Sequence, residues 1–173
     1  SLHDALPISM EAIRIFLGLG SNLGDRQHHL ALARQAIGRR IGPIQLTSSL
    51  YETQPWGRSD QPEFINQVIE LRSPLSPEAL MKTILELEQS LGRERRQKWA
   101  ERVIDIDILA YGNKIVHKDG LHIPHPELHK RNFVLVPFME IAGDWVHPEL
   151  DLSIEELYFE SRDPLDVVLL DHE

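Results

Sequence analysis

Apolar and polar positions follow two different rhythms in the first part of the chain. Residues 13–19 form a compact apolar run, interrupted only by Arg14, which predicts a buried strand. Residues 25–41 then carry apolar side chains at helical spacing, which predicts an amphipathic helix. The stripe of this helix that faces the core consists of Leu30, Ala33, Ile37 and Ile41. The pattern therefore begins with a strand followed by a helix.

Two further strands are predicted over residues 44–51 and 64–71, where β-branched and apolar residues are frequent. The segment between them, residues 52–62, is rich in Pro, Gly and polar residues and is predicted to be a loop. It carries a tryptophan, Trp56, and loops carry binding residues more often than cores do. The alternative is a surface loop whose Trp56 side chain folds back on the body of the protein.

A second helix is predicted over residues 77–91. Ser76 is a typical capping residue, Pro77 suits the first helical position, and Gly92 suits the end. The apolar stripe consists of Leu80, Met81, Ile84, Leu85, Leu87 and Leu91.

Glu88 falls within that stripe, whereas Glu86 points away from it. A carboxylate on the buried side near a helix C-terminus meets both a desolvation cost and an unfavourable helix dipole. We therefore expect Glu88 to have a partner, and Arg93 or Arg95 is close enough along the chain to provide an ion pair.

The next segment alternates strictly. Its isoleucines, at positions 104, 106 and 108, would point to one face of a strand, and Asp105 and Asp107 to the other. Residues 111–114 then predict a hairpin turn that leads into a short strand beginning at residue 115.

The last part of the chain predicts two helices. One spans residues 133–142 and ends at Gly143, with Pro137 inside it, and a shorter one spans residues 154–159. The remainder is acidic, and we expect residues 161–173 to be a peripheral tail. Residues 1–9 fit no element and are interpreted as a non-native leader, so that residues 10–160 form a single domain.

Composition narrows the function classes. The chain has 173 residues, 42% of them hydrophobic and 26% charged, as expected of one globular domain. Its net charge of −9 argues against binding to nucleic acid. It has no cysteine, in agreement with a cytoplasmic location, and no apolar run approaches the roughly 18–20 residues of a membrane span.

The strongest chemical signal is the pair of aspartates that follows a basic loop. Asp105 and Asp107 would lie about 6–7 Å apart at their Cα atoms on one face of a strand, where they repel each other unless a cation lies between them. Mg²⁺ accepts one or two carboxylates and leaves its other positions to water and phosphate. The loop before them, residues 93–102, carries four Arg and one Lys, and Arg binds phosphate in bidentate fashion. The pattern favours phosphoryl or nucleotidyl transfer. The alternative is that the same residues form only an exposed sheet face beside a solvated loop.

The glycines of residues 18–24 have another interpretation that we exclude. A dinucleotide-binding turn needs Gly-x-Gly-x-x-Gly, whereas the spacing here is Gly-x-Gly-x-x-x-Gly. No Gly-x-x-x-x-Gly-Lys-Ser/Thr loop is present either. We therefore expect these glycines to serve the turn itself.

Two further groups are candidates for the same site. His125 and Arg131 belong to a proline-rich segment one hairpin after the aspartates, where a returning strand would bring them near Asp105. The segment 53–66 offers aromatic and amide groups for a flat ligand. A structural histidine and a surface ion pair are the plain alternatives for His125 and Arg131, since the chain contains nine histidines.

Six stretches together resemble one family, that of 6-hydroxymethyl-7,8-dihydropterin pyrophosphokinase, which acts in folate synthesis. They lie in order between residues 13 and 150, and the stretch over residues 102–109 is the most specific of them. The stretches are GLGSNLG (18–24), SLYET (49–53), DQPEFIN (60–66), LEQSLGR (87–93), RVIDIDIL (102–109) and IPHPELHKRNF (123–133).

The resemblance implies an activity, a fold and a set of ligands. The enzyme would transfer pyrophosphate from ATP to the hydroxymethyl group of the reduced pterin and release AMP. The fold would be α+β, an antiparallel sheet with helices packed on both faces and a ferredoxin-like core. Two Mg²⁺ ions would be bound, ATP and the pterin would be the only partners, without nucleic acid or membrane, and the chain would be a monomer.

The resemblance also implies roles for individual residues. Asp105 and Asp107 would bind the metal ions, and Arg93, Arg102 and Asp107 would be catalytic. ATP would be contacted by Glu88, Arg93, Arg95, Trp99, Arg102, Ile108, His125 and Arg131. The pterin would be contacted by Thr53, Pro55, Trp56, Phe64, Asn66 and Phe133. The family often has Tyr at the position of Phe64, so a hydroxyl contact is lost here while ring stacking is kept.

Two alternatives come from other classes. Ferredoxin-like sheets with aromatic and Arg side chains can bind single-stranded RNA, but the net charge of −9 and the aspartate pair argue against this. The other alternative is a different Mg²⁺-dependent nucleotidyl or phosphoryl transferase.

Overall fold

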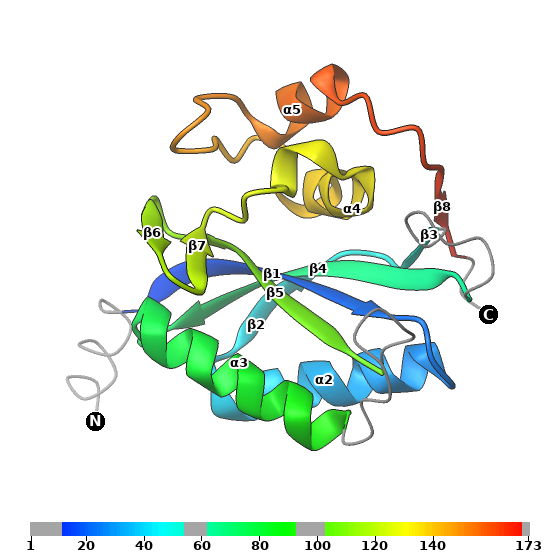
Figure 1. Ribbon diagram of the computed structural model, residues 1–173, viewed down its shortest axis with the longest axis vertical. Coiled ribbons are helices and arrows are strands. Elements are labelled where there is room, and N and C mark those ends of the chain that lie inside the picture. The colour runs from blue at the N-terminus through cyan, green and yellow to red at the C-terminus, as the bar shows by residue number, and fades with distance from the viewer. Residues whose placement is uncertain (1–11, 54–61, 93–102, 171–173) are drawn as a thin grey trace.

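The computed structural model describes residues 12–53, 62–92 and 103–170. An antiparallel six-stranded sheet forms its centre (Figure 1). In spatial order the strands are β5 (Asp105–Tyr111), β1 (Ile13–Ser21), β4 (Phe64–Ser73), β3 (Tyr51–Thr53) and β8 (Val167–Leu169), while β2 (Ile44–Thr47) also pairs with β4.

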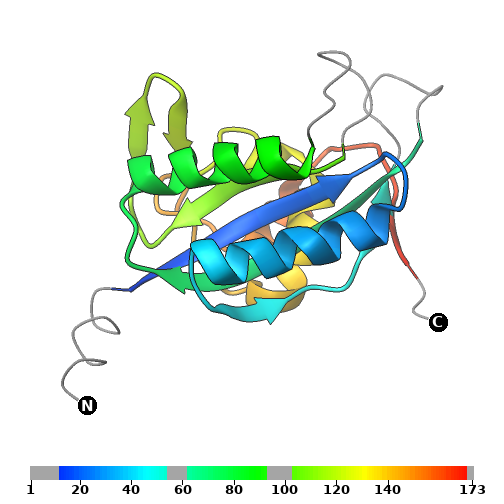
Figure 2. The ribbon, with the colours of Figure 1, turned by 90° about the horizontal axis from the view of Figure 1, so that it is seen from below.

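Helices cover both faces of this sheet (Figure 1). Helices α2 (Arg26–Arg40) and α3 (Pro77–Leu91) lie side by side on one face, as Figure 2 shows, and α4 (Asn132–Ala142) and α5 (Ile154–Glu160) lie on the other. The chain order β1, α2, β2 and β3, β4, α3, β5 is the β-α-β-β-α-β arrangement of ferredoxin-like folds. The predicted fold class is therefore confirmed.

Side chains near the helix ends explain where α2 and α3 begin. The Asp25 carboxylate accepts a hydrogen bond from the main-chain N–H of His28 at 3.2 Å. The Ser76 hydroxyl accepts one from Ala79 at 3.1 Å, and α3 ends at Gly92. These caps satisfy N–H groups that have no partner within the helix.

The predicted apolar stripe of α2 is buried at all four positions. That of α3 is wrong at Leu85, whose side chain is 56% exposed. The side chains of α3 that are buried against the sheet are Leu80, Ile84 and Leu87. Their i, i+4, i+7 spacing leaves Leu85 beside the stripe, on the solvent side.

The single strand predicted over residues 44–51 is wrong, because the chain leaves the sheet between β2 and β3. Polar side chains replace the strand ladder at this break. The Ser48 hydroxyl accepts a hydrogen bond from the Val68 main-chain N–H at 3.0 Å, and the Gln67 amide donates to the Ser48 carbonyl at 2.7 Å. Such local side-chain bonds to the backbone compete with regular pairing.

The hairpin predicted at residues 111–114 also differs from the structure. A turn occurs there, with Gly112 at φ 53°, but the following strand does not pair with β5. Instead β6 (Val116–Lys118) pairs with β7 (Leu121–Ile123) in a separate two-stranded sheet. The described ladder of β5 runs along β1, and the turn is held to that strand because the Gly112 N–H donates to the Arg14 carbonyl.

Each face of the sheet has its own hydrophobic core. The core under α4 and α5 contains an aromatic group in which the Phe16 and Phe138 ring centroids lie 4.5 Å apart and those of Phe138 and Trp145 5.5 Å apart. A short 3₁₀ helix, η1 (Leu128–Lys130), leads into α4. The two cores pack against the strands β4 and β5, which carry Phe64, Asn66, Asp105 and Asp107.

The segment after α5 was expected to be a tail, but it contributes the outermost strand of the sheet. Val167 pairs with Thr53, and Leu169 pairs with Tyr51. A domain boundary at residue 160 is therefore too early, because the sheet includes β8. Little in the sequence indicates this strand, since its neighbours are charged and two of its three side chains are exposed.

Candidate functional site

A cavity of about 430 Å³ lies on the α4 side of the sheet. Its floor comes from β1, β4 and β5, and its walls come from the end of β3, from η1, and from the start of α4. The side chains and glycines that line it are Gly18, Leu19, Gly20, Thr53, Phe64, Asn66, Gln67, Val68, Asp105, Asp107, Leu109, Glu127, Lys130, Arg131, Phe133, Val134 and Asp163.

The structure brings seven predicted site residues into this cavity. They come from four separate elements and from the residue just before α4, which lie far apart in the sequence. These residues are Thr53, Phe64, Asn66, Asp105, Asp107, Arg131 and Phe133.

The two aspartates sit on β5 as the alternation predicted. Ile106 and Ile108 are buried at 4% exposure each on the opposite face, while Asp105 is half-buried and Asp107 is exposed. Two carboxylates that open into a cavity beside Lys130 and Arg131 suit Mg²⁺, which takes few protein ligands when phosphate supplies the others. The donor set therefore fits a metal–phosphate complex.

Glu88 contacts the strand segment that carries the aspartates. Its carboxylate accepts a hydrogen bond from the main-chain N–H of Ile106 at 2.8 Å. Ile106 lies between the two aspartates, so Glu88 fixes the backbone on which both are mounted. Glu88 faces the protein and Glu86 faces solvent, as predicted. The expected ion pair with Arg93 or Arg95 falls outside the described residues.

The glycines of β1 form part of the cavity floor. Gly20 is paired with Asp105, and Gly18 with Asp107. Our prediction that these glycines serve a turn is wrong for both, because β1 continues through Ser21. It holds for Gly24, whose φ of 67° is a turn conformation. A Cβ added at Gly20 would lie 3.1 Å from the Asn66 side-chain oxygen, so the Asn66 amide would have to move by a few tenths of an ångström to admit one.

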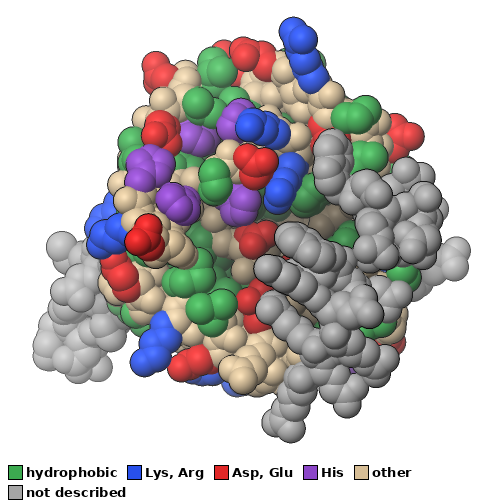
Figure 3. All heavy atoms as spheres, viewed as in Figure 1, with side chains coloured by type: hydrophobic (Ala, Val, Ile, Leu, Met, Phe, Trp, Pro, Cys, Tyr) green, Lys and Arg blue, Asp and Glu red, His purple; other side chains and the backbone are tan. Residues whose placement is uncertain are grey.

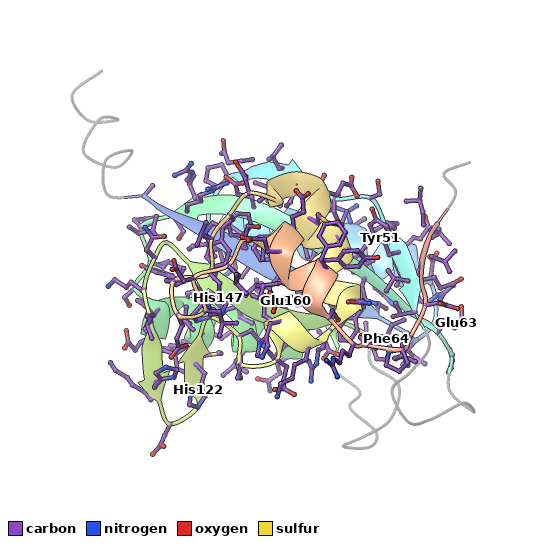
Figure 4. All side chains as sticks on the ribbon, turned by 90° about the horizontal axis from the view of Figure 1, so that it is seen from above. Tyr51, Glu63, Phe64, His122, His147 and Glu160 are labelled. Atoms are coloured by element: carbon purple, nitrogen blue, oxygen red, sulfur yellow. The ribbon has the colours of Figure 1, made fainter. Side chains whose placement is uncertain are left out.

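An aromatic and an amide group lie at the other end of the cavity. The buried Asn66 side chain donates from Nδ2 to the Thr53 hydroxyl at 2.7 Å, which fixes the orientation of its amide. Phe64 pairs with Thr53 across the two strands. Figure 4 shows Phe64 at the same end of the molecule as the segment that leads to β8.

Arg131 and Phe133 approach the cavity from the start of α4. The Arg131 guanidinium carbon lies 5.6 Å from the centre of the Phe133 ring, within the range of a cation–π contact. The ring and the cation thus form one wall, opposite the floor of glycines and carboxylates.

His125 lies beside this wall, although it does not line the cavity. Its main-chain N–H donates to the Leu109 carbonyl at 3.0 Å, which ties the segment to β5. Burial lowers the pKa of His125, and the Asp107 carboxylate opposes that shift. The imidazole is therefore neutral at pH 7. Its Nδ1 accepts from the Glu127 N–H at 3.1 Å, so the proton resides on Nε2.

Besides Glu88 and His125, several predicted residues do not appear at the cavity. The Ile108 side chain belongs to the core on the opposite face of the sheet. The others lie outside the described residues: Pro55, Trp56, Arg93, Arg95, Trp99 and Arg102.

Sequence reasoning missed some residues that line the cavity. Lys130 stands next to the predicted Arg131, and its positive charge was a usable signal. Gln67 follows Asn66 but has no local pattern that marks it. Asp163 lies about thirty residues beyond α4's first turn, and only the tertiary fold brings it there.

A separate group of histidines lies toward the β6–β7 hairpin, on the face that Figure 3 shows. His117 and His122 are paired across the hairpin with ring centroids 5.9 Å apart, and the Glu149 carboxylate is 3.0 Å from His117 Nε2. Within the described ranges, no group of three His, Asp or Glu side chains is arranged to hold a metal ion.

A sheet that directs two carboxylates into a cavity with cationic and aromatic side chains defines the chain as a small α+β transferase. Comparison with known proteins makes this specific, because residues 16–143 match the family described as 7,8-dihydro-6-hydroxymethylpterin-pyrophosphokinase. The chain belongs to that family.

Relatives of similar length support this assignment. A 2-amino-4-hydroxy-6-hydroxymethyldihydropteridine pyrophosphokinase of Haemophilus influenzae is 40% identical over 144 residues, which cover 83% of this chain and 90% of the relative. The protein of the same name from Aquifex aeolicus is 38% identical over 134 residues, which cover 78% of this chain and 83% of that protein.

Longer relatives contain a similar unit. A folic acid synthesis protein of Pneumocystis carinii is 40% identical over 152 residues, and the chain spans 20% of its length. A crystal structure of Plasmodium falciparum HPPK-DHPS superposes with a TM-score of 0.71 at 18% identity, over 86% of this chain and 44% of that one. At this identity the structural likeness shows the fold.

Proposed function

We propose that the chain transfers pyrophosphate from ATP to 6-hydroxymethyl-7,8-dihydropterin and releases AMP, as a step of tetrahydrofolate biosynthesis. The main support for this reaction is the family assignment. The observation that supports it in this chain is a single cavity in which Asp105 and Asp107 face Arg131 and an aromatic–amide pocket. A metal–nucleotide site and a site for a flat acceptor are thus adjacent.

In this proposal Asp105 and Asp107 hold two Mg²⁺ ions. When bound, the ions neutralise phosphate charge and orient the attacking oxygen. The chain's own contribution is to present both carboxylates on one face of β5, with Glu88 holding the intervening N–H. Asp107 would also take up the proton of the acceptor hydroxyl.

The nucleotide would lie toward η1 and the start of α4. Arg131 would bind its phosphates, and the neutral His125 would donate from Nε2. Glu88 and main-chain atoms at Ile108 would contribute from the β5 side. Arg93, Arg95, Trp99 and Arg102 lie outside the described residues. In this proposal they contact ATP, and Arg93 and Arg102 stabilise the transition state.

The pterin would be stacked between Phe64 and Phe133, which line the same cavity. Asn66 would bind its edge, because Thr53 already fixes the amide in one orientation. Main-chain groups of Thr53, Pro55 and Trp56 would complete the set. Stacking suits a flat heterocycle because aromatic pairs gain from offset contact beyond the area they bury.

The chemistry is an in-line displacement at the β-phosphorus of ATP. The hydroxymethyl oxygen forms a bond to this phosphorus and loses its proton. The bond from the β-phosphorus to the oxygen that bridges it to the α-phosphate breaks, and AMP leaves with that oxygen. Exclusion of water from the cavity would favour the pterin alcohol over water as the acceptor of the pyrophosphoryl group.

Other parts of our predictions are not settled by the family assignment. Within the described ranges, no helix is long and apolar enough to cross a membrane. The monomeric state, the cytoplasmic location and the number of metal ions stay predictions.

Product analysis tests the proposal. The protein is incubated with ATP, Mg²⁺ and the reduced hydroxymethylpterin, and nucleotides and pterins are separated by chromatography. We expect equal amounts of AMP and pterin pyrophosphate, and no AMP when the pterin is omitted. ADP would indicate transfer of one phosphoryl group, and free pyrophosphate would indicate nucleotidyl transfer, so either result would contradict the proposal.

A further inference from the structure

The segment that links α5 to β8 reaches the cavity from outside the part of the chain that matches the family. The match ends at residue 143, whereas Asp163 lines the cavity together with Arg131 and Phe133. Figure 1 shows this segment descending from α5 past α4 to the edge of the sheet. It is therefore in a position to act on the acceptor end of the site.

Asp163 makes specific contacts with the first turn of α4. Its Oδ2 accepts a hydrogen bond from the main-chain N–H of Asn132 at 2.8 Å, and its Oδ1 accepts from the Leu165 N–H at 3.0 Å. Asn132 is the first residue of α4, and the preceding residue, Arg131, provides no side-chain cap. Asp163 thus caps α4 from a distant part of the chain, where a negative charge also suits the helix dipole.

This cap stands between two predicted substrate contacts. Arg131 and Phe133 flank Asn132 in the sequence, and both line the cavity. Because adjacent residues share one backbone, fixing the N–H of Asn132 restricts where both side chains can be presented. The same carboxylate therefore influences the cation and the ring that form the α4 wall.

The segment is anchored at its other end to the opposite wall. Val167 pairs with Thr53, and the Leu170 N–H donates to the Leu50 carbonyl at 2.9 Å. Thr53 in turn accepts from Asn66. Residues 163–170 consequently connect the start of α4 to the strand that orients the amide of the pocket.

We propose that Asp163 is a positioning residue of the acceptor pocket, whose carboxylate holds the start of α4 so that Phe133 and Arg131 are presented to the pterin and the nucleotide. The proposal rests on the proposed function for the identity of these ligands. Asp163 touches no reacting atom in this account. It acts through the Asn132 N–H.

Replacing Asp163 by Ala removes both accepted hydrogen bonds. We expect the KM for the pterin to rise on the order of tenfold, because the part-buried Asn132 N–H loses its acceptor, with kcat changed less than the KM. Asp166→Ala is the matched control, because Asp166 lies in the same segment and is exposed. Its KM should equal that of the wild type.

A second pair of variants tests the hydrogen bond without changing Asp163. Asn132→Pro removes the N–H from which Asp163 accepts a hydrogen bond. Proline suits position 132 because this is the first residue of α4 and because the preceding residue, Arg131, is extended, with φ −125° and ψ 107°. Asn132→Ala keeps the N–H and controls for loss of the side chain. Asn132→Pro should raise the pterin KM as Asp163→Ala does, and the double variant should be no worse than either, because both remove one interaction.

The outcomes separate the inference from the proposed function. Equal KM values for Asp163→Ala and Asp166→Ala would overturn the inference, as would a lowered melting temperature with an unchanged KM. If Asp163→Ala does not fold, the pterin KM values of Asn132→Pro and Asn132→Ala are compared instead, and equal values would overturn the inference. If the wild type releases no AMP, the proposed function fails, and calorimetric titration with the reduced pterin then tests whether Asp163→Ala still weakens binding.

Discussion

At the scale of single residues, the absence of side chains shapes the cavity as much as their presence. Gly18 and Gly20 lie opposite the two aspartates on the neighbouring strand and line the cavity floor. Side chains there would occupy the space between the carboxylates and the aromatic–amide end. We interpret this floor as the place where the two substrates meet.

Gly20→Ala tests that interpretation. The new methyl group would lie 3.1 Å from the Asn66 side-chain oxygen, so the amide must shift. We expect pterin binding to weaken by about tenfold, ~1.4 kcal/mol, which is within the usual cost of overpacking. Gly38→Ala is the control, since a Cβ there meets nothing within 4 Å. Unchanged pterin affinity in Gly20→Ala, measured by calorimetric titration, would contradict this interpretation of the floor.

His147 sets a pH dependence of stability. Its side chain is buried, burial lowers its pKa, and its Nδ1 accepts from the main-chain N–H groups of Glu149 and Leu150. The unfolded chain binds this proton near the ordinary value of about 6.5, so it holds more protons than the folded protein just below that pH. The free energy of unfolding should therefore decrease as the pH falls below about 6.5.

Urea unfolding between pH 5 and pH 7 measures this effect. In His147→Asn the titrating group is gone while an acceptor oxygen remains, so the decrease should become shallower. Burial also lowers the pKa of His125, which leaves part of the slope in place. Parallel curves for the variant and the wild type would show that His147 does not contribute.

At the scale of elements, local signals predicted the helices better than the strands. The ends of α3 followed from Ser76 and Gly92, because capping depends on residues close in sequence. The break between β2 and β3 depends on Ser48 and Gln67, which meet only once β4 is in place. Strand β8 likewise exists because β3 offers an edge, a condition that no local pattern reveals.

The contact between α3 and β5 gives an element-scale prediction. Glu88→Ala leaves the buried strand segment without the acceptor of the Ile106 N–H, which should cost about 1–3 kcal/mol of stability and raise the Mg²⁺ concentration needed for half-maximal rate. Glu88→Gln retains an acceptor oxygen and should lose less.

Glu86→Ala provides the comparison on the same helix. Glu86 forms an exposed ion pair with Arg40 at 2.7 Å, and such pairs contribute roughly 0–1 kcal/mol. Thermal unfolding and Mg²⁺ titrations of the three variants would show whether Glu88 acts on the metal-binding strand. An equal Mg²⁺ requirement in Glu88→Ala and Glu86→Ala would show that it does not.

At the scale of the whole molecule, the fold gathers into one cavity residues that the sequence presents as separate motifs. The alternation of β5 predicted that Asp105 and Asp107 share a face, and the structure agrees. That Phe64, Asn66 and Phe133 join them followed from a family resemblance, because nothing in their own spacing relates β4 to α4. Neither the local pattern nor the family resemblance predicted Asp163. It lies beyond the matched motifs and reaches the cavity only through the course of the chain after α5.

The rate of AMP release as a function of Mg²⁺ concentration tests our claim that the two carboxylates on β5 bind the metal ions of a pyrophosphoryl transfer. The wild type should show saturable dependence on Mg²⁺. Asp105→Asn and Asp107→Asn should each lose at least roughly 100-fold in rate at every Mg²⁺ concentration, since metal ions supply several kcal/mol of transition-state stabilisation. A near-normal rate in either folded variant would contradict the claim.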